Sequence, residues 1–217
     1  STPMPSVGRN VTRKEGVEKV TGAARYIDDY RFPGMLHART IRSTIPCGRI
    51  LSIDLGRVTP ANGFTIVDHR DIPGPNVIAA IAEDQPALVE REVRHAAEPI
   101  LLIAHEDRDA LLKADVRIEY QASEPLYDPK ASTTSFKTIQ IIKGDVERGL
   151  AEADVVVEAE YRAGHQEQLY IEPQGVIALP ERDGVTVYGS IQCPYYVHKA
   201  LVVLLGLPAD QVRVVVT

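Results

Sequence analysis

Short apolar runs, each bounded by glycine, proline or polar residues, fill the first 120 residues of the chain. Runs of this length, rich in β-branched residues, favour strands over helices. We expect strands at residues 38–41, 50–55 and 64–67. Residues 71–75 (DIPGP) combine aspartate, proline and glycine and predict a tight turn after the third of these strands.

The most continuous apolar run, residues 100–104, is typical of a strand that is buried on both faces. Residues 106–113 follow, with acidic residues at the beginning and Lys113 at the end, an order that complements a helix dipole. Residues 116–120 favour a second strand. Strand, helix and strand predict a small parallel unit with a right-handed crossover.

Residues 123–136 are rich in serine, threonine, proline and lysine, and predict a linker between two domains. Beyond it, Asp145 is placed to cap a helix at 146–153. We expect strands at 155–161, 169–179, 185–191 and 212–216, with a polar turn at 181–184. The resulting fold class is a mixed α+β protein.

Apolar residues recur at helical spacing late in the chain, at Val197, Ala200, Leu201, Leu204 and Leu205. They predict an amphipathic helix that ends at Gly206, ahead of Pro208. The strand at 212–216 then runs into the end of the sequence, where it would lie at an open sheet edge. We therefore expect the natural chain to continue beyond Thr217.

Composition narrows the function classes. The chain is 44% hydrophobic and 25% charged, as in ordinary globular domains, and its net charge of -6 comes without a basic run, so nucleic acid is not an expected partner. Its longest apolar stretch, residues 200–207, is far shorter than the roughly 20 residues of a membrane helix. With no signal peptide at the N-terminus, we expect a cytoplasmic protein without a membrane partner.

Candidate metal and acid/base residues are sparse. His165 and Glu167 alternate along a possible strand, but no third ligand lies nearby, so a turn or strand-surface role is favoured over a metal site. Asp28 and Asp29 are adjacent, which would place their carboxylates on opposite faces of a strand, and a turn is favoured over an acid/base pair.

The two cysteines, Cys47 and Cys193, could form a disulfide, although two unpaired thiols are favoured. For Cys193, a buried or half-buried thiol is favoured over a nucleophile, because no pattern in the sequence assigns it a base or a lowered pKa. No nucleophile elbow, phosphate loop or dinucleotide-binding glycine motif occurs either. The residues alone predict no complete catalytic apparatus.

A series of short motifs in order along the chain resembles the molybdenum-binding subunit of the xanthine dehydrogenase/aldehyde oxidase family. The motifs are residues 19–29 (KVTGAARYIDD), 34–39 (GMLHAR), 42–43 (RS), 49–54 (RILSID), 71–74 (DIPG), 92–94 (EVR), 98–99 (EP), 116–120 (VRIEY), 143–146 (KGDV), 166–173 (QEQLYIEP), Gln192, 205–208 (LGLP) and 212–214 (VRV). Each motif is weak alone, but their ordered sum is specific.

The resemblance implies an α/β-hammerhead domain over residues 1–130 and the N-terminal part of a molybdopterin-binding domain over residues 131–217. It implies an oxidoreductase that hydroxylates an aromatic heterocycle or aldehyde with water as the oxygen source. The implied cofactor is molybdopterin with molybdenum, in a dinucleotide form, and iron–sulfur clusters and FAD are expected on partner subunits or domains. A small-molecule substrate is implied, and a homo-oligomer is left open.

The resemblance assigns a role to one residue of the chain, Gln192, as the family glutamine beside the oxo ligand of molybdenum. An amide there donates a hydrogen bond without adding a titrating charge. No catalytic residue and no metal ligand is expected in residues 1–217, since the glycine-rich cofactor loop, the substrate pocket and the glutamate base lie further downstream in the family.

The sequence departs from the family pattern at several positions. Cys47 and Gln168 stand where histidines are common, and Ala96–Ala97 replaces a pair such as Val-Gly before Glu-Pro. The segment from residue 104 to 116 is also short. These departures indicate a divergent branch. Two alternatives stay open: a short, non-catalytic subunit for partner binding or assembly, and part of a related reductase that acts on an aromatic thioester.

Overall fold

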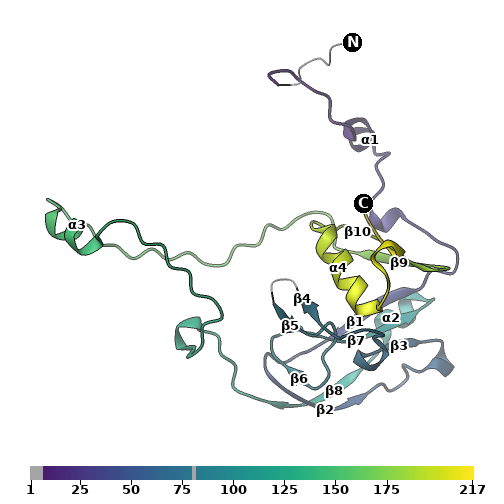
Figure 1. The fold of residues 1–217 in the computed structure, drawn as a ribbon. Helices are drawn as coiled ribbons and strands as arrows, with labels where there is room; N and C mark the ends of the chain where they lie inside the picture. The colour runs from purple at the N-terminus through teal and green to yellow at the C-terminus, as the bar shows by residue number, and fades with distance from the viewer. Residues whose placement is uncertain (1–6, 80–81) are drawn as a thin grey trace. The chain divides into compact units, whose positions relative to one another are not determined.

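The computed structural model describes residues 7–79 and 82–217. The chain divides into two compact units: one is built from residues up to 124 together with residues 172–217, and the other from residues 125–171. Figure 1 labels the main elements. The strands are β1 (His37–Arg42), β2 (Gly48–Asp54), β3 (Thr65–Val67), β4 (Ile78–Ala79), β5 (Glu83–Gln85), β6 (Glu92–Val93), β7 (Pro99–His105), β8 (Arg117–Ala122), β9 (Val176–Glu181), β10 (Gly184–Gly189) and β11 (Val212–Val216).

The helices are short. The α-helices are α1 (Gly16–Thr21), α2 (Arg108–Lys113), α3 (Val146–Glu152) and α4 (Pro194–Leu205), and the 3₁₀ helices are η1 (Ile27–Asp29), η2 (Pro60–Asn62), η3 (His69–Asp71), η4 (Pro129–Ala131) and η5 (Ala209–Gln211). None of the helices in the described ranges combines the length and apolar character that a membrane crossing requires.

Strand β7 is the centre of the first unit. It pairs antiparallel with β1 on one side and β3 on the other, which gives the sheet order β1-β7-β3. Its residues Leu101 and Ile103 belong to one buried cluster, with Phe64 and Leu111, whereas Ile100 belongs to another. The expectation of a strand buried on both faces is confirmed for these three residues of β7, which supply two cores, whereas Leu102 between them is 36% exposed.

A second antiparallel sheet has the order β6-β2-β8, and β4 pairs with β5. These pairings correct the expected parallel unit at residues 100–120. Strands β7 and β8 lie in different sheets, and the pairs that each makes are antiparallel. The connection between them, residues 106–116 with the helix α2, leads to a different sheet, where β8 pairs with β2 instead of returning beside β7.

The parallel unit of this chain lies instead at its C-terminal end. Strands β10 and β11 pair in parallel, and α4 connects them (Figure 1). Strand β9 completes the sheet as an antiparallel hairpin partner of β10, with Glu181 paired to Gly184 across the polar turn that the sequence predicts. The helix ends at Gly206, which takes the left-handed conformation at φ 63°, as its position predicts.

The early part of the first unit packs on this sheet. The ring centroids of Tyr30 and Phe32 lie 5.7 Å and 5.6 Å from that of Tyr188 in β10. Nearby, Ile27 is 5% exposed, and it contacts Gly175 just before β9. Residues 27–32 therefore pack on the C-terminal sheet of this unit.

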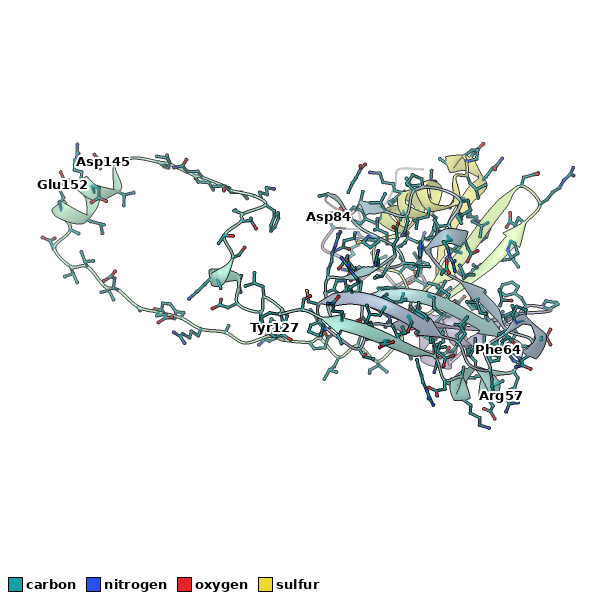
Figure 2. All side chains as sticks on the ribbon, turned by 90° about the horizontal axis from the view of Figure 1, so that it is seen from below. Arg57, Phe64, Asp84, Tyr127, Asp145 and Glu152 are labelled. Atoms are coloured by element: carbon teal, nitrogen blue, oxygen red, sulfur yellow. The ribbon has the colours of Figure 1, made fainter. Side chains whose placement is uncertain are left out.

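The second unit, residues 125–171, contains the helix that the sequence predicts. Its cap Asp145 accepts a hydrogen bond from the backbone N–H of Arg148 at 3.0 Å, and Figure 2 labels Asp145 and Glu152 at the two ends of α3. The strand expected at 155–161 is wrong, because this stretch is irregular. A strand needs hydrogen bonds from a neighbouring strand, and no part of the described chain supplies them there.

The strand expected at 169–179 is only partly correct. Residues 169–175 are irregular, and the strand occupies Val176–Glu181, where β10 pairs with it. Leu169 takes a positive φ of 48°, which is incompatible with a strand. Periodicity alone placed the beginning of this strand too early.

Candidate cofactor-binding site

The carboxyl ends of β10 and β11 meet at one edge of the C-terminal sheet. The two strands run parallel, with Gly189 opposite Val216 at their ends. In sheets of this kind, ligands bind in the crevice outside the carboxyl ends of the strands. Residues that follow β10 and β11 directly are therefore the first candidates for contact with a ligand.

Gln192 lies at this edge, in the bend between the end of β10 and the beginning of α4. Its side chain is exposed and makes no hydrogen bond to any residue that the structure describes. An unpaired amide retains two N–H donors and a carbonyl acceptor. The Gln192 amide can therefore form hydrogen bonds with a bound group.

Ser190 holds a neighbouring segment against the same strand end. Its hydroxyl donates to the carbonyl of Pro173 at 3.2 Å and accepts from the N–H of Gly175 at 3.2 Å. The backbone N–H of Ser190 also donates to the Gly175 carbonyl at 3.3 Å. No role is predicted for Ser190 from the sequence, although it stands two residues before Gln192 in the Gly-Ser-Ile-Gln run.

Two polar atoms close to this edge in the chain are buried without a partner in the described part of the structure. One is Glu172 Oε1, in the residue before Pro173, and the other is Thr217 Oγ1. The backbone N–H of Thr217 donates to the Gly189 carbonyl at 3.0 Å, which places this residue at the end of β10. Unsatisfied buried polar atoms are uncommon and costly. Together with the free amide of Gln192, they fit a polar group bound by hydrogen bonds at this edge.

The structure does not bring the other candidate residues, the two cysteines, His165 and Glu167, together as a site. Cys193 is exposed, which corrects the expected buried or half-buried thiol, because it precedes the first turn of α4 rather than packing beneath the sheet. Cys47 is half-buried, and both thiols are free. His165 and Glu167 lie in an irregular exposed stretch, outside any strand, so of the two roles expected for them the strand surface is wrong.

Asp28 and Asp29 belong to the 3₁₀ helix η1, in agreement with the expected turn, and the Asp29 carboxylate accepts from the Tyr26 N–H at 2.8 Å. Across residues 7–79 and 82–217, no three histidine, cysteine, aspartate or glutamate side chains gather as a metal site.

Two family models match the chain one after the other. Residues 21–124 match the aldehyde oxidase and xanthine dehydrogenase a/b hammerhead domain, and residues 127–217 match the molybdopterin cofactor-binding domain. The chain belongs to the xanthine dehydrogenase/aldehyde oxidase family. The edge that carries Gln192 thus lies within the match to the cofactor-binding domain.

Curated relatives of this family match along most of the chain. The large molybdopterin subunit of nicotinate dehydrogenase from Eubacterium barkeri is 30% identical over 96% of this chain and 53% of its own length. A probable xanthine dehydrogenase subunit of Bacillus subtilis is 32% identical over 94% of this chain and 29% of its own length. The chain therefore spans about half or less of these relatives.

Solved structures share the fold. The aldehyde oxidoreductase from Desulfovibrio gigas superposes with a TM-score of 0.81 at 23% identity, covering 94% of this chain and 26% of that chain. Quinoline 2-oxidoreductase from Pseudomonas putida 86 gives 0.78 at 22% identity, covering 98% of this chain and 30% of that one. At this identity, the likeness establishes the α+β fold, a hammerhead domain followed by cofactor-binding elements.

Proposed function

We propose that this chain is part of a molybdopterin-dependent oxidoreductase subunit that hydroxylates an aromatic heterocycle or an aldehyde with water as the oxygen source. The observation that carries the proposal is the ordered match of two consecutive family domains across residues 21–217. We further propose that the hammerhead domain occupies residues 1–130 and the cofactor-binding domain begins at residue 131.

The substrate class is supported by the names of the relatives. Nicotinate, xanthine and quinoline are aromatic heterocycles, and other relatives are named for the oxidation of abscisic aldehyde and indole-3-acetaldehyde. Both groups share an electron-poor carbon next to nitrogen or oxygen. We propose a substrate of this kind for the complete protein.

Gln192 is the residue of this chain that we propose to contact the molybdenum cofactor, in its dinucleotide form. When bound, the cofactor supplies the two-electron oxidation of the substrate carbon. The Gln192 amide donates a hydrogen bond to it, and because an amide does not titrate, the contact persists across the working pH range. Ser190 supports this contact by fixing the segment next to the strand end.

Partner subunits or domains that carry iron–sulfur clusters and FAD are proposed to remove the electrons. The chain itself holds only two cysteines, Cys47 and Cys193, whereas an iron–sulfur cluster generally needs four thiolate ligands. Two relatives are named as single subunits of larger enzymes, nicotinate dehydrogenase and xanthine dehydrogenase, in keeping with a division of these cofactors among chains.

The experiment is expression of the complete gene product with its partners, followed by metal analysis and turnover in ¹⁸O-labelled water. We expect molybdenum in the purified protein and label in the hydroxylated product of a heterocycle or aldehyde. An active, fully assembled complex without molybdenum contradicts the proposal. Product label that comes from dioxygen instead of water contradicts it as well.

The role of Gln192 is tested with Gln192→Ala in the same complex. We expect unchanged molybdenum content and a fall in kcat of about 10- to 100-fold, the range for lost contacts around a metal centre. The electron paramagnetic resonance signal of the molybdenum should also change. Gln121→Ala is the matched control, because Gln121 is an exposed glutamine on β8, away from the cofactor-binding domain. Identical signals in both variants contradict the role.

A further inference from the structure

The turn that follows β3 meets the last turn of α4. The backbone N–H of Gly74 donates a hydrogen bond to the Leu204 carbonyl at 2.8 Å. The last carbonyls of a helix have no partner inside the helix and need one from elsewhere. Gly206 supplies a partner for the Val203 carbonyl at 3.3 Å, and Gly74 supplies one for Leu204. A residue far away in sequence therefore completes the cap of α4.

Space, not backbone conformation, explains why this residue is glycine. A Cβ atom on Gly74 would lie 2.0 Å from the Val203 carbonyl oxygen and 3.1 Å from that of Leu204. Contacts below 3.0 Å to backbone atoms cannot be relieved by rotating a side chain. Any side chain at position 74 therefore forces the turn and the helix apart.

The turn is rigid on both sides of Gly74. On one side, Asp68 and Asp71 form a reciprocal capping box, in which the Asp71 carboxylate accepts from the Asp68 N–H at 2.8 Å. On the other side, the Asn76 amide donates to the Leu88 carbonyl at 2.7 Å and accepts from the N–H groups of Ala87 and Leu88 at 3.0 Å and 3.1 Å. These bonds hold the glycine in place.

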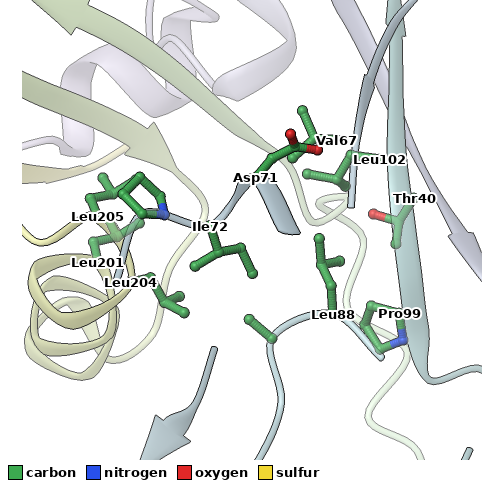
Figure 3. A pocket seen from close by; sticks show the side chains of 12 residues that line it. Thr40, Val67, Asp71, Ile72, Leu88, Pro99, Leu102, Leu201, Leu204 and Leu205 are labelled. Atoms are coloured by element: carbon green, nitrogen blue, oxygen red, sulfur yellow. The ribbon is translucent and has the colours of Figure 1, made fainter. Parts of the chain in front are cut away.

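The rest of this interface is loosely packed. An apolar pocket of about 370 Å³ lies beside the contact. Ile72 and Leu204 line it on one side, and Leu88, Pro99 and Leu102 line it on the other (Figure 3). Because close packing is what fixes the relative position of two elements, a pocket between α4 and strand β7 leaves the Gly74 turn to hold this side of the helix. On its other side, α4 packs on β11.

We propose that Gly74 is a positioning residue for Gln192, acting through α4. The helix begins at Pro194, two residues after Gln192, and its twelve residues span about 18 Å at 1.5 Å per residue. Helices transmit displacement as nearly rigid elements, so a shift at Leu204 moves the Gln192 bend. The inference rests on the proposed function of Gln192 and extends it to the hammerhead domain.

The test is amide hydrogen exchange of the 217-residue chain, which requires no cofactor. In Gly74→Ala, we expect exchange of the backbone N–H groups in residues 190–197 to accelerate about tenfold, as the beginning of α4 loses its fixed position. Gly164→Ala is the matched control, because a Cβ at Gly164 meets nothing within 4 Å and Gly164, like Gly74, lies outside the helices and strands. This control should leave exchange in 190–197 unchanged.

Acceleration confined to residues 201–207 overturns the proposal, because Gly74 would then cap only the end it touches. If Gly74→Ala does not fold, Asn76→Ala provides the test, since it loosens the turn without adding a clash. We expect about threefold faster exchange at 190–197 in that variant, and an unchanged rate overturns the proposal.

In the assembled enzyme, Gly74→Ala should reproduce the altered molybdenum signal of Gln192→Ala with unchanged metal content. An unaltered signal overturns the positioning role in the loaded enzyme. The exchange result is separate from the role of Gln192 at the cofactor, which the Gln192→Ala variant tests alone. A failure of one is therefore distinguishable from a failure of the other.

Discussion

Strand β7 and the stretch from residue 155 to 171 carry similar aliphatic side chains in opposite environments. In β7, Ile100 is 1% and Ile103 0% exposed, whereas Val157 is 85% and Ile171 100% exposed. The difference lies in the neighbours. β7 has a strand on each side, whereas the described chain offers no strand to residues 155–171. Apolar, β-prone sequence therefore becomes a strand only where a partner supplies its hydrogen bonds.

The largest effect that distinguishes the two regions should come from truncating a side chain in each. Ile103→Ala removes a fully buried group from the main core and should lower the free energy of unfolding by about 2–5 kcal/mol. Ile171→Ala, at a fully exposed position, should change it by less than about 0.5 kcal/mol. Urea denaturation of the 217-residue chain measures both. Equal losses would contradict the distinction between the regions.

Helix caps offer the next comparison. Asp107 caps α2, which buries Leu111 in the main core, and its carboxylate accepts from the Asp109 N–H at 2.8 Å. Asp107→Ala should cost about 1 kcal/mol of unfolding free energy. Asp145→Ala removes the equivalent cap of α3 and should reduce helicity there without moving the main unfolding transition, since α3 buries no residue. A shift of equal size from Asp145→Ala would show that the two units unfold together.

Relief of backbone strain should change the free energy of unfolding by less than these substitutions, and it should stabilise the fold. Ala97 takes a positive φ of 61°, at the position where the family pattern has a glycine before Glu-Pro, and β7 begins shortly afterwards. A left-handed conformation costs an ordinary residue about 1–2 kcal/mol, part of which glycine recovers. Ala97→Gly should therefore raise the unfolding free energy by about 0.5–1 kcal/mol.

Leu169 is the matched position in the other region, with a φ of 48°. Leu169→Gly should leave the unfolding midpoint unchanged, because no core depends on that residue, which is 82% exposed. Thermal unfolding of both variants provides the measurement. A destabilised Ala97→Gly chain would contradict the strain argument.

The smallest effect concerns acid stability of the turn that presents Gly74. A hydrogen bond from the Arg70 guanidinium lowers the pKa of Asp68 below its ordinary value, against a smaller opposing effect of burial. A carboxyl whose folded-state pKa is depressed stabilises the fold above its unfolded pKa and loses this contribution as pH falls through the folded pKa. Stability from Asp68 should therefore persist until the pH drops below the ordinary aspartate range, about 3.9.

Arg70→Ala should return the pKa of Asp68 toward its ordinary value and shift the acid transition slightly upward. Carboxyl-carbon NMR titration of Asp68 measures the first effect, and acid unfolding measures the second. The size stays small, because the Arg70 side chain is 78% exposed and the pair is screened by solvent. An unchanged Asp68 titration would contradict the assigned cause.

The sequence by itself determined the helix ends and turns, because these depend on residues that are neighbours along the chain. Asp145 and Gly206 mark helix ends because capping depends on a few neighbouring residues, and the turn at 181–184 closes a hairpin between adjacent strands. The ordered motifs also identified the family, because they preserve family-specific residues in chain order. The role of Gln192 came from that resemblance and stays a prediction.

Only the tertiary structure decided which strands pair and where a parallel unit forms. Pairing depends on backbone groups brought together from distant positions. The apolar pattern at 100–120 suggested a parallel unit, but β8 pairs with β2 in another sheet, and the parallel unit formed from β10, α4 and β11. The same holds for Gly74. Its sequence context indicated a turn, but its contact with Leu204 exists only once the chain has folded.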